Sequence, residues 1–169
     1  LDCLVNNAGI AGPTGRVEEV NPEDWDRCLA IDLTGQFNCT RLAVPHLEQS
    51  KNASIMNLSS QAGKHGFPLR SAYAAAKWGV IGFSKSIAIE LGPRGIRVNA
   101  VSAGVVDTDA LGYFPNREQL LAEFAARTPA GPRLAPENVA DAVYLLCLPE
   151  ASWINGHTLV VDGGFAISG

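Results

Sequence analysis

A tyrosine and a lysine four residues apart, Tyr73 and Lys77, lie in the alanine-rich stretch "SAYAAAKWG". Residues at this spacing share one face of a helix, so a helix here would point the phenol and the ammonium in the same direction. Two serines, Ser59 and Ser60, end the apolar run "ASIMNLSS" shortly before this stretch. We expect a serine hydroxyl, the phenol and the ammonium to converge where the run ends and the helix begins.

These three groups could interconvert a carbonyl and an alcohol by moving a proton, with the hydride supplied by another molecule. A free phenol titrates near 10, but a nearby ammonium favours the phenolate and lowers the phenol pKa. A decrease of about three units requires roughly 4 kcal/mol, which Lys77 could supply in a poorly solvated site with a cationic ring nearby. Tyr73 would then act as a general acid/base. An isolated Tyr-x-x-x-Lys pair also occurs by chance on exposed helices, so the interpretation depends on the preceding serine.

The elements that would position these groups alternate between short apolar runs and longer helical patterns. The runs that predict strands are "LDCLVNNAG", "ASIMNLSS", "IRVNAVSAG" and "HTLVVDGG". The segments that predict helices are Pro22 to about Gln49, Ser71 to Leu91, Arg117 to Arg127 and Pro136 to Leu148. This alternation predicts a single α/β domain over residues 1–169, with a parallel sheet and helices on both faces.

Residues at the ends of the predicted elements support their boundaries. Asn21 before Pro22 and Glu23 provides an N-cap, a proline at the first helical position and an acid in the first turn. Gly92 is expected to end the long helix by adopting a left-handed conformation before Pro93. Because ligands of parallel sheets bind beyond the carboxyl ends of the strands, "NNAGIAG", "SSQAG", "SAGVVDTD" and "DGG" are the segments expected to border a site.

Composition excludes several other kinds of function. The chain of 169 residues has a formal net charge of -4 and no run of Lys or Arg, which argues against nucleic acid or a membrane surface as a partner. No apolar run approaches the length that spans a bilayer and no signal peptide opens the sequence, so a cytoplasmic location is expected. The cysteines lack C-x-x-C spacing and the histidines are dispersed, so no metal site is predicted. The cysteines are Cys3, Cys28, Cys39 and Cys147.

Four motifs in order carry a resemblance to a known family. "NNAG", "NLSS" followed by "YAAAK", "IRVNAVSAG" and "INGHTLVVDGG" together cover essentially the whole chain. This set resembles the short-chain dehydrogenase/reductases, which use NAD or NADP. The resemblance implies a Rossmann-like, doubly wound parallel sheet and an oxidoreductase that interconverts a secondary alcohol and a ketone. Relatives are commonly homodimers or homotetramers, and the sequence favours neither, nor does it distinguish NAD from NADP.

The resemblance also implies roles for individual residues. Tyr73 matches the catalytic acid/base, Lys77 matches the residue that binds the nicotinamide ribose and lowers the tyrosine pKa, and Ser60 rather than Ser59 matches the serine that positions the substrate oxygen. The substrate pocket would include Gln61, Phe67 and the segment from Thr108 to about Phe124. The residues implied to border the cofactor, besides Tyr73 and Lys77, are Asn6, Ala8, Gly9, Gly104, Val106 and Thr108.

Two positions depart from the family pattern. Asp32 in "LAIDLTGQF" stands where the family usually has an asparagine that holds a water in a proton relay. Its charge would stabilise Lys77 and oppose the phenolate, which would slow the reaction or shift its pH profile without abolishing it. The alternative is that Asp32 is a tolerated neighbour with no effect. Ala103 replaces a proline in "SAGVVDTD", which would make that loop less rigid.

The family's glycine-rich TGxxxGxG turn is not present in the sequence. "GIAGPTG" has a different spacing and follows a different strand. We expect the chain to be the C-terminal part of a longer Rossmann-fold protein, with on the order of 70 to 90 residues missing before Leu1. The chain would then have an unpaired strand edge. We expect it to bind NAD(P) weakly or not at all by itself. An inactive fragment, or a non-catalytic scaffold for binding or assembly, is the alternative, although Ser60, Tyr73 and Lys77 are all retained.

Overall fold

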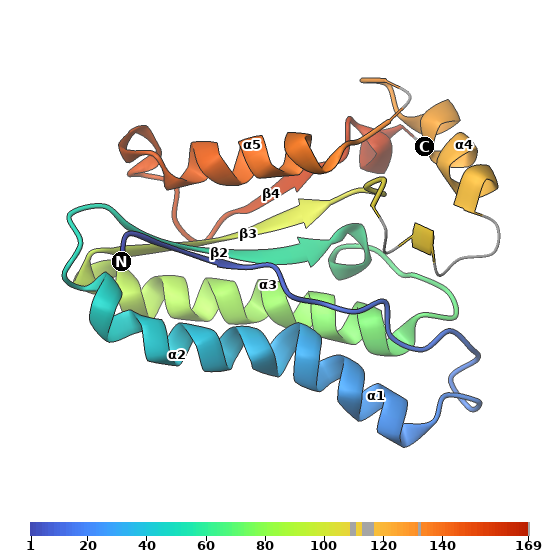
Figure 1. Ribbon diagram of the computed structural model, residues 1–169, viewed down its shortest axis with the longest axis horizontal. Coiled ribbons are helices and arrows are strands. Elements are labelled where there is room, and N and C mark those ends of the chain that lie inside the picture. Colours follow the sequence, from blue (N-terminus) through green and yellow to red (C-terminus); the bar gives the residue numbers. More distant parts are fainter. Residues whose placement is uncertain (109–110, 113–116, 132, 169) are drawn as a thin grey trace.

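Four parallel strands form the centre of the computed structural model, which describes residues 1–108, 111–112, 117–131 and 133–168 (Figure 1). The strands are β1 (Cys3–Asn6), β2 (Ala53–Ser60), β3 (Ile96–Ala103) and β4 (Thr158–Val161). Their spatial order, β1-β2-β3-β4, follows the chain, and Asn6 pairs with Asn57 while Ser60 pairs with Ala103. The carboxyl ends of all four strands therefore meet at one edge of the sheet.

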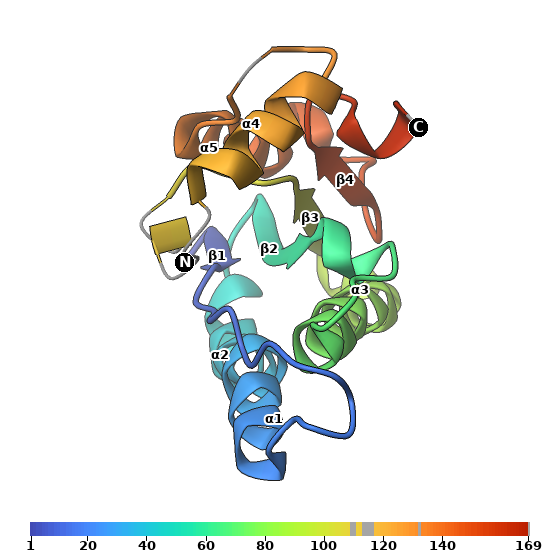
Figure 2. The same cartoon turned by 90° about the vertical axis from the view of Figure 1, so that its right-hand side faces the viewer.

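Helices cover both faces of this sheet. One layer contains α1 (Pro22–Leu29), α2 (Gly35–Leu47) and α3 (Ser71–Leu91), and the other contains α5 (Pro136–Cys147). The remaining helix, α4 (Arg117–Arg127), lies near the carboxyl ends of the strands (Figure 2). Because both faces are covered, all but the last residue of β2 and of β3 are buried. The α/β fold and the parallel sheet predicted from the sequence are confirmed.

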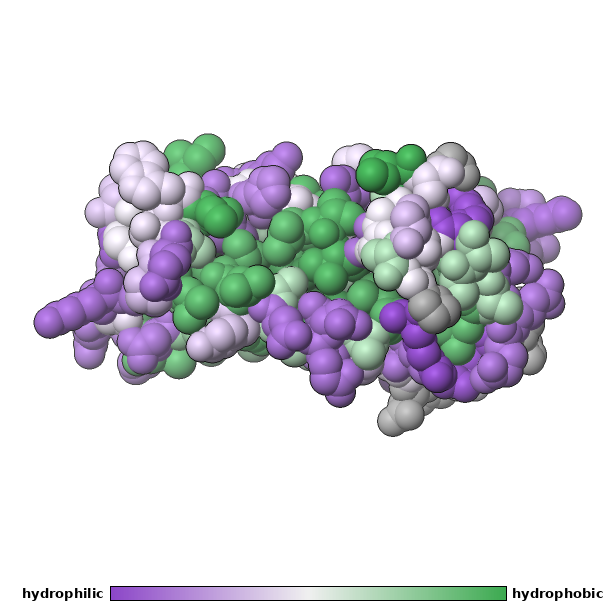
Figure 3. All heavy atoms as spheres, turned by 90° about the horizontal axis from the view of Figure 1, so that it is seen from above, coloured by the Kyte–Doolittle hydropathy of each residue, from purple (hydrophilic) through white to green (hydrophobic). Residues whose placement is uncertain are grey.

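Two apolar clusters hold the layers together. The cluster beneath the sheet includes Leu47, Ile55 and Val98, and the cluster beneath α5 includes Met56 and Leu146. On the α5 side, apolar side chains continue to the surface in the middle of the molecule (Figure 3). Three large apolar residues of β1 and α5 are exposed: Val5 of β1, and Tyr144 and Leu145 of α5. None of the described helices is long and apolar enough to cross a bilayer.

Element boundaries follow the sequence with two differences. The Asn21 side chain accepts a hydrogen bond from the Glu23 backbone N–H at 2.9 Å, which confirms the predicted N-cap. The helix predicted from Pro22 to about Gln49 contains a π-helical turn, Ala30–Thr34, between α1 and α2. Helix α3 ends at Leu91, as predicted, but Gly92 stays right-handed with φ −52°, and Gly95, after one 3₁₀ turn, is the left-handed residue with φ +78°.

Candidate active site

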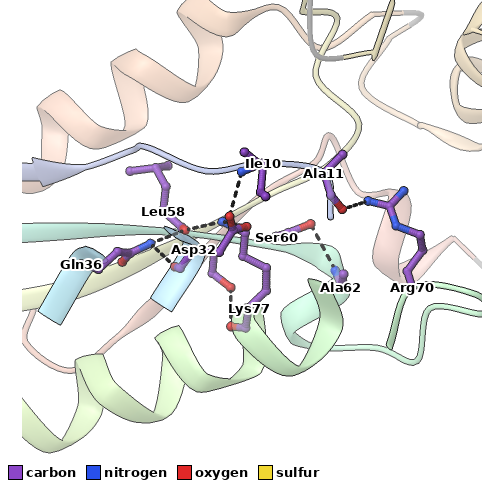
Figure 4. A network of polar contacts seen from close by, with 10 residues as sticks. Ile10, Ala11, Asp32, Gln36, Leu58, Ser60, Ala62, Arg70 and Lys77 are labelled. Atoms are coloured by element: carbon purple, nitrogen blue, oxygen red, sulfur yellow. Dashed lines mark hydrogen bonds and ion pairs between the residues drawn. The ribbon is translucent and has the colours of Figure 1, made fainter. Parts of the chain in front are cut away.

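Lys77 and Asp32 form a buried ion pair at the carboxyl ends of β1 and β2 (Figure 4). The Lys77 Nζ lies 3.4 Å from the Asp32 Oδ2, and the two side chains are 6% and 0% exposed. Lys77 also donates a hydrogen bond to the Leu58 carbonyl oxygen at 3.3 Å. Burying a charge costs free energy unless the charge is paired, so each of these two groups offsets the cost of burying the other.

The π-helical turn fixes the position of Asp32. The Gln36 Nε2 donates to the Asp32 carbonyl oxygen at 3.1 Å and to the Leu58 carbonyl oxygen at 3.2 Å, which ties the turn to β2. The Asp32 Oδ1 accepts a hydrogen bond at 2.7 Å from the Ile10 backbone N–H, in the loop after β1. π-Helical turns occur often at functional sites, and this one brings a carboxylate to the lysine.

Tyr73 lies half-buried in the first turn of α3, close to two cations. The Lys77 Nζ is 5.4 Å from the centroid of its ring, and the Cζ of Arg70 is 5.1 Å from the same centroid. Arg70 is 6% exposed and donates to the carbonyl oxygen of Ala11, so it also ties α3 to the loop after β1. Burial lowers the pKa of Arg70, and the neighbouring acidic groups oppose that shift. The Tyr73 ring therefore lies between two positively charged side chains.

The sequence did not reveal Arg70 as part of the site. The available signal was its position three residues before Tyr73, at a spacing where helical side chains meet. The helix dipole disfavours a cation at a helix N-terminus. Sequence reasoning would therefore place the Arg70 guanidinium in solvent, away from the site. Arg70 is instead buried, with a hydrogen bond to the carbonyl oxygen of Ala11, 59 residues earlier in the sequence.

The two serines at the end of β2 have different environments. The Ser59 hydroxyl is buried and donates to the Lys77 backbone carbonyl at 2.9 Å, so it fastens α3 to β2. The Ser60 Oγ is half-buried and accepts a hydrogen bond from the Ala62 N–H at 3.2 Å. A hydroxyl can accept and donate at once, so this bond leaves Ser60 able to donate to a ligand.

Gly63, in the connection between β2 and α3, lies so close to α3 that no side chain fits there. A Cβ at this position would lie 2.6 Å from the Lys77 carbonyl oxygen and would overlap the Ser59 Oγ. We expect Gly63→Ala to cost about 1–3 kcal/mol of folding stability, because the added methyl displaces the bond between Ser59 and Lys77. Urea denaturation measures this cost. Gly66→Ala is the matched control, since nothing lies within 4 Å of its Cβ, and an equal loss in both variants would contradict the prediction.

Asn6, predicted to border a cofactor, uses its side chain inside the protein. It is 6% exposed, and its Nδ2 donates to the Thr40 Oγ1 at 3.1 Å and to the Asn57 Oδ1 at 2.8 Å. These bonds hold β1 to β2 and α2. Ala8 and Gly9 are exposed, and a Cβ at Gly9 would lie 3.4 Å from both the Lys77 Nζ and the Asp32 Oδ2. The Gly9 backbone therefore lies beside the ion pair, and a side chain at this position would contact both charged groups.

The segment after β3 packs against the end of β4. The Gly104 N–H donates to the Val161 carbonyl oxygen at 2.9 Å, and a Cβ at Gly104 would lie 3.0 Å from the Cβ of Asp162. Val106 forms an isolated bridge with Leu134. The Thr108 carbonyl oxygen accepts a hydrogen bond from the Leu111 N–H at 3.0 Å. This segment therefore lines the same edge of the sheet as the ion pair.

Gln61, one of the residues predicted to shape the substrate pocket, connects two strands of the sheet. Its Nε2 donates to the carboxylate of Asp162, which links the end of β2 to the end of β4. Phe67 is 45% exposed, and its ring centroid is 5.8 Å from the Arg70 Cζ, so it is joined to the Tyr73 environment through that guanidinium.

The segment predicted to help form the substrate pocket, from Thr108 to about Phe124, is described only in part. Residues 109–110 and 113–116, including Tyr113 and Phe114, lie outside the described residues. Arg117, at the start of α4, pairs with Asp107 at 2.5 Å, and Phe124 stacks on Phe165 with ring centroids 4.2 Å apart. These contacts attach α4 to the exits of β3 and β4.

The fold and the site are those of a Rossmann-like α/β protein with a Tyr-x-x-x-Lys pair at the carboxyl ends of its strands. A family model described as Enoyl-(Acyl carrier protein) reductase matches residues 1–166. The chain belongs to the short-chain dehydrogenase/reductase family.

Relatives with assigned functions agree with this membership. The chain is 40% identical to a 3-oxoacyl-[acyl-carrier-protein] reductase of Thermotoga maritima, over 99% of this chain and 67% of the relative. It is 43% identical to a trans-4-hydroxycyclohexanecarboxylate dehydrogenase of Sinomonas cyclohexanicum, over 97% of this chain and 60% of the relative. The solved structure of ElxO with NADP bound superposes with a TM-score of 0.88 at 32% identity, covering 98% of this chain and 67% of that one. The chain thus spans 60 to 67% of the length of these proteins.

Proposed function

We propose that the protein carrying this chain is an NAD(P)-dependent oxidoreductase that interconverts a secondary alcohol and a ketone. The observation that carries the proposal is the placement of Tyr73 beside Lys77, whose charge is held by Asp32 at the carboxyl ends of the strands. The names of the relatives, a 3-oxoacyl reductase and a hydroxycarboxylate dehydrogenase, support this reaction class.

The residues present fit the nicotinamide part of the cofactor. The exposed backbone of Ala8 and Gly9 leaves room over Lys77 that a side chain at Gly9 would fill. Lys77 would hold the ribose hydroxyls, and the backbone of Gly104, Val106 and Thr108 would border the ring, as the family pattern implies. When bound, NAD(P) supplies or accepts the hydride.

The chain's own residues would handle the proton. In reduction, the Tyr73 hydroxyl donates its proton to the ketone oxygen; in oxidation, the phenolate removes the proton of the alcohol. Ser60 donates a hydrogen bond to the same oxygen and holds it beside the phenol. Lys77 and Arg70 place positive charge beside the Tyr73 ring, and Asp32 holds Lys77 in position.

Turnover by the complete gene product tests the proposal. We expect NADH or NADPH to be consumed with ketones and the oxidised cofactors to be reduced with secondary alcohols, followed at the nicotinamide absorbance. A panel that includes 3-oxoacyl thioesters and 4-oxocyclohexanecarboxylate samples the chemistry of the relatives. Cofactor binding without turnover of any carbonyl or alcohol would contradict an enzyme and favour a non-catalytic scaffold.

Arg70 is expected to act as a positioning residue for Tyr73. In Arg70→Gln, the Tyr73 ring loses the guanidinium whose Cζ lies 5.1 Å from its centroid, a contact worth about 1–2 kcal/mol. We expect kcat to fall by roughly tenfold with little change in KM, because about 1.4 kcal/mol corresponds to a factor of ten in rate. Arg70→Lys is expected to restore part of kcat by returning the charge. The exposed Arg94 provides a control: Arg94→Gln is expected to leave kcat unchanged, and equal kcat values in all variants would contradict the role of Arg70.

A further inference from the structure

Cys3 and Cys147 bring two thiols together at the end of the sheet opposite Tyr73. Cys3 begins β1 and Cys147 ends α5, 144 residues later in the sequence. Their sulfur atoms lie 2.9 Å apart, in contact with each other, and both residues are half-buried and reduced. A disulfide bond is about 2.05 Å long, so the two sulfurs need to approach by about 0.9 Å to form one.

Neighbouring contacts fix both ends of this pair. Cys3 stands in register with Ser54 of β2, which sets its place in the sheet. The Cys147 carbonyl oxygen accepts a hydrogen bond from the Asn52 Nδ2 at 2.9 Å. One residue earlier, the Leu146 carbonyl oxygen accepts from the Nη1 of the buried Arg97 at 2.7 Å. The end of α5 is thereby held against the starts of the strands, which keeps the two thiols together.

We propose that Cys3 and Cys147 are an oxidation site that forms an intramolecular disulfide in the presence of a mild thiol oxidant such as the diazene diamide. The two thiols lose two electrons and two protons as the sulfur–sulfur bond forms. The nitrogen–nitrogen double bond of diamide accepts them and becomes a hydrazine. The bond would join β1 covalently to α5.

The rate of this reaction is expected to depend on pH, because the thiolate is the reacting form. Burial, followed by the hydrogen bond with Cys147, raises the pKa of Cys3 to about 11, whereas Ser54 and the charge of Arg97 oppose that increase. At neutral pH only about one Cys3 in 10⁴ is therefore ionised. If Cys3 is the attacking thiol, the rate of disulfide formation should rise roughly tenfold per pH unit between pH 7 and 9.

Peptide mapping of the complete gene product tests the proposal and does not require enzymatic activity. The reduced, folded protein is treated with diamide and then unfolded in urea, so that N-ethylmaleimide also reaches the buried Cys28 when it blocks the remaining thiols. The digest is analysed by mass spectrometry. We expect a cross-linked peptide pair containing Cys3 and Cys147, lighter by two hydrogen atoms, while Cys28 and Cys39 carry the blocking group. Cys39→Ser is the matched control, since it removes an exposed thiol on α2 and should leave the cross-link intact. Cys147→Ser should abolish it.

The melting temperature provides a second measurement. Closing so long a loop should raise the midpoint of the oxidised wild-type protein by roughly 5 to 15 °C over the reduced form. Cross-links that involve Cys39, or four blocked thiols after diamide treatment, would overturn the proposal. So would a cross-linked protein that melts below the reduced form, because α5 would then have to move for the bond to form.

Discussion

Tyr73→Phe is expected to lower kcat by about 10²- to 10⁴-fold, the usual contribution of a positioned acid or base. The change removes only the hydroxyl oxygen. The ring stays in place beside Arg70 and Lys77, because their charged groups lie 5.1 Å and 5.4 Å from its centroid and do not depend on the hydroxyl oxygen for these contacts. Stability should therefore remain within about 0.5 kcal/mol of the wild type, as for a substitution that leaves packing unchanged.

A steady-state assay of the complete gene product, combined with urea denaturation, checks both parts of this prediction. Tyr144→Phe is the matched control, because it removes the same atom from a tyrosine that is 64% exposed on α5. That variant should keep its activity. If Tyr73→Phe retained more than a tenth of wild-type kcat, proton transfer by Tyr73 would be wrong even though the family assignment would stand.

The fold was predictable because its signals are local. Runs of β-branched and apolar residues marked β2 and β3, which are buried on both faces, and Asn21 marked the start of α1 through its own side chain. The left-handed turn after α3 was placed at Gly92 instead of Gly95, because both glycines permit it and the intervening 3₁₀ turn decides between them. The spacing of Tyr73 and Lys77 was similarly local, since both belong to one helix.

Features of the site that depend on long-range packing were not predictable in the same way. Arg70 donates a hydrogen bond to the carbonyl oxygen of Ala11, and Cys147 at the end of α5 meets Cys3 at the start of β1. The amide of Asn6 was expected near a cofactor but is committed to Thr40 and Asn57, which a motif cannot reveal. A sequence pattern identifies which residues occur at the strand ends, whereas the packing decides where each side chain points.

The departure at Asp32 has a physical consequence that a motif comparison leaves open. An asparagine at this position could still accept the hydrogen bond from the Ile10 N–H, so the loop after β1 does not require a carboxylate. The carboxylate additionally neutralises the buried Lys77. Asp32 therefore has a larger role in holding the lysine than in holding the loop.

Lys77→Met should accordingly destabilise the protein by about 3–5 kcal/mol, because it leaves the Asp32 carboxylate buried without its counter-ion. Adding Asp32→Asn to that variant should recover part of the loss, since a neutral amide is cheaper to bury than an unpaired carboxylate. Urea denaturation of the wild type, both single variants and the double variant measures the coupling energy, expected at about 0.5–3 kcal/mol. The same cycle on the exposed Arg94–Glu48 pair should give almost none, because water screens that contact. Equal coupling in the two cycles would mean that Asp32 does not hold Lys77, and the departure would then be a tolerated one.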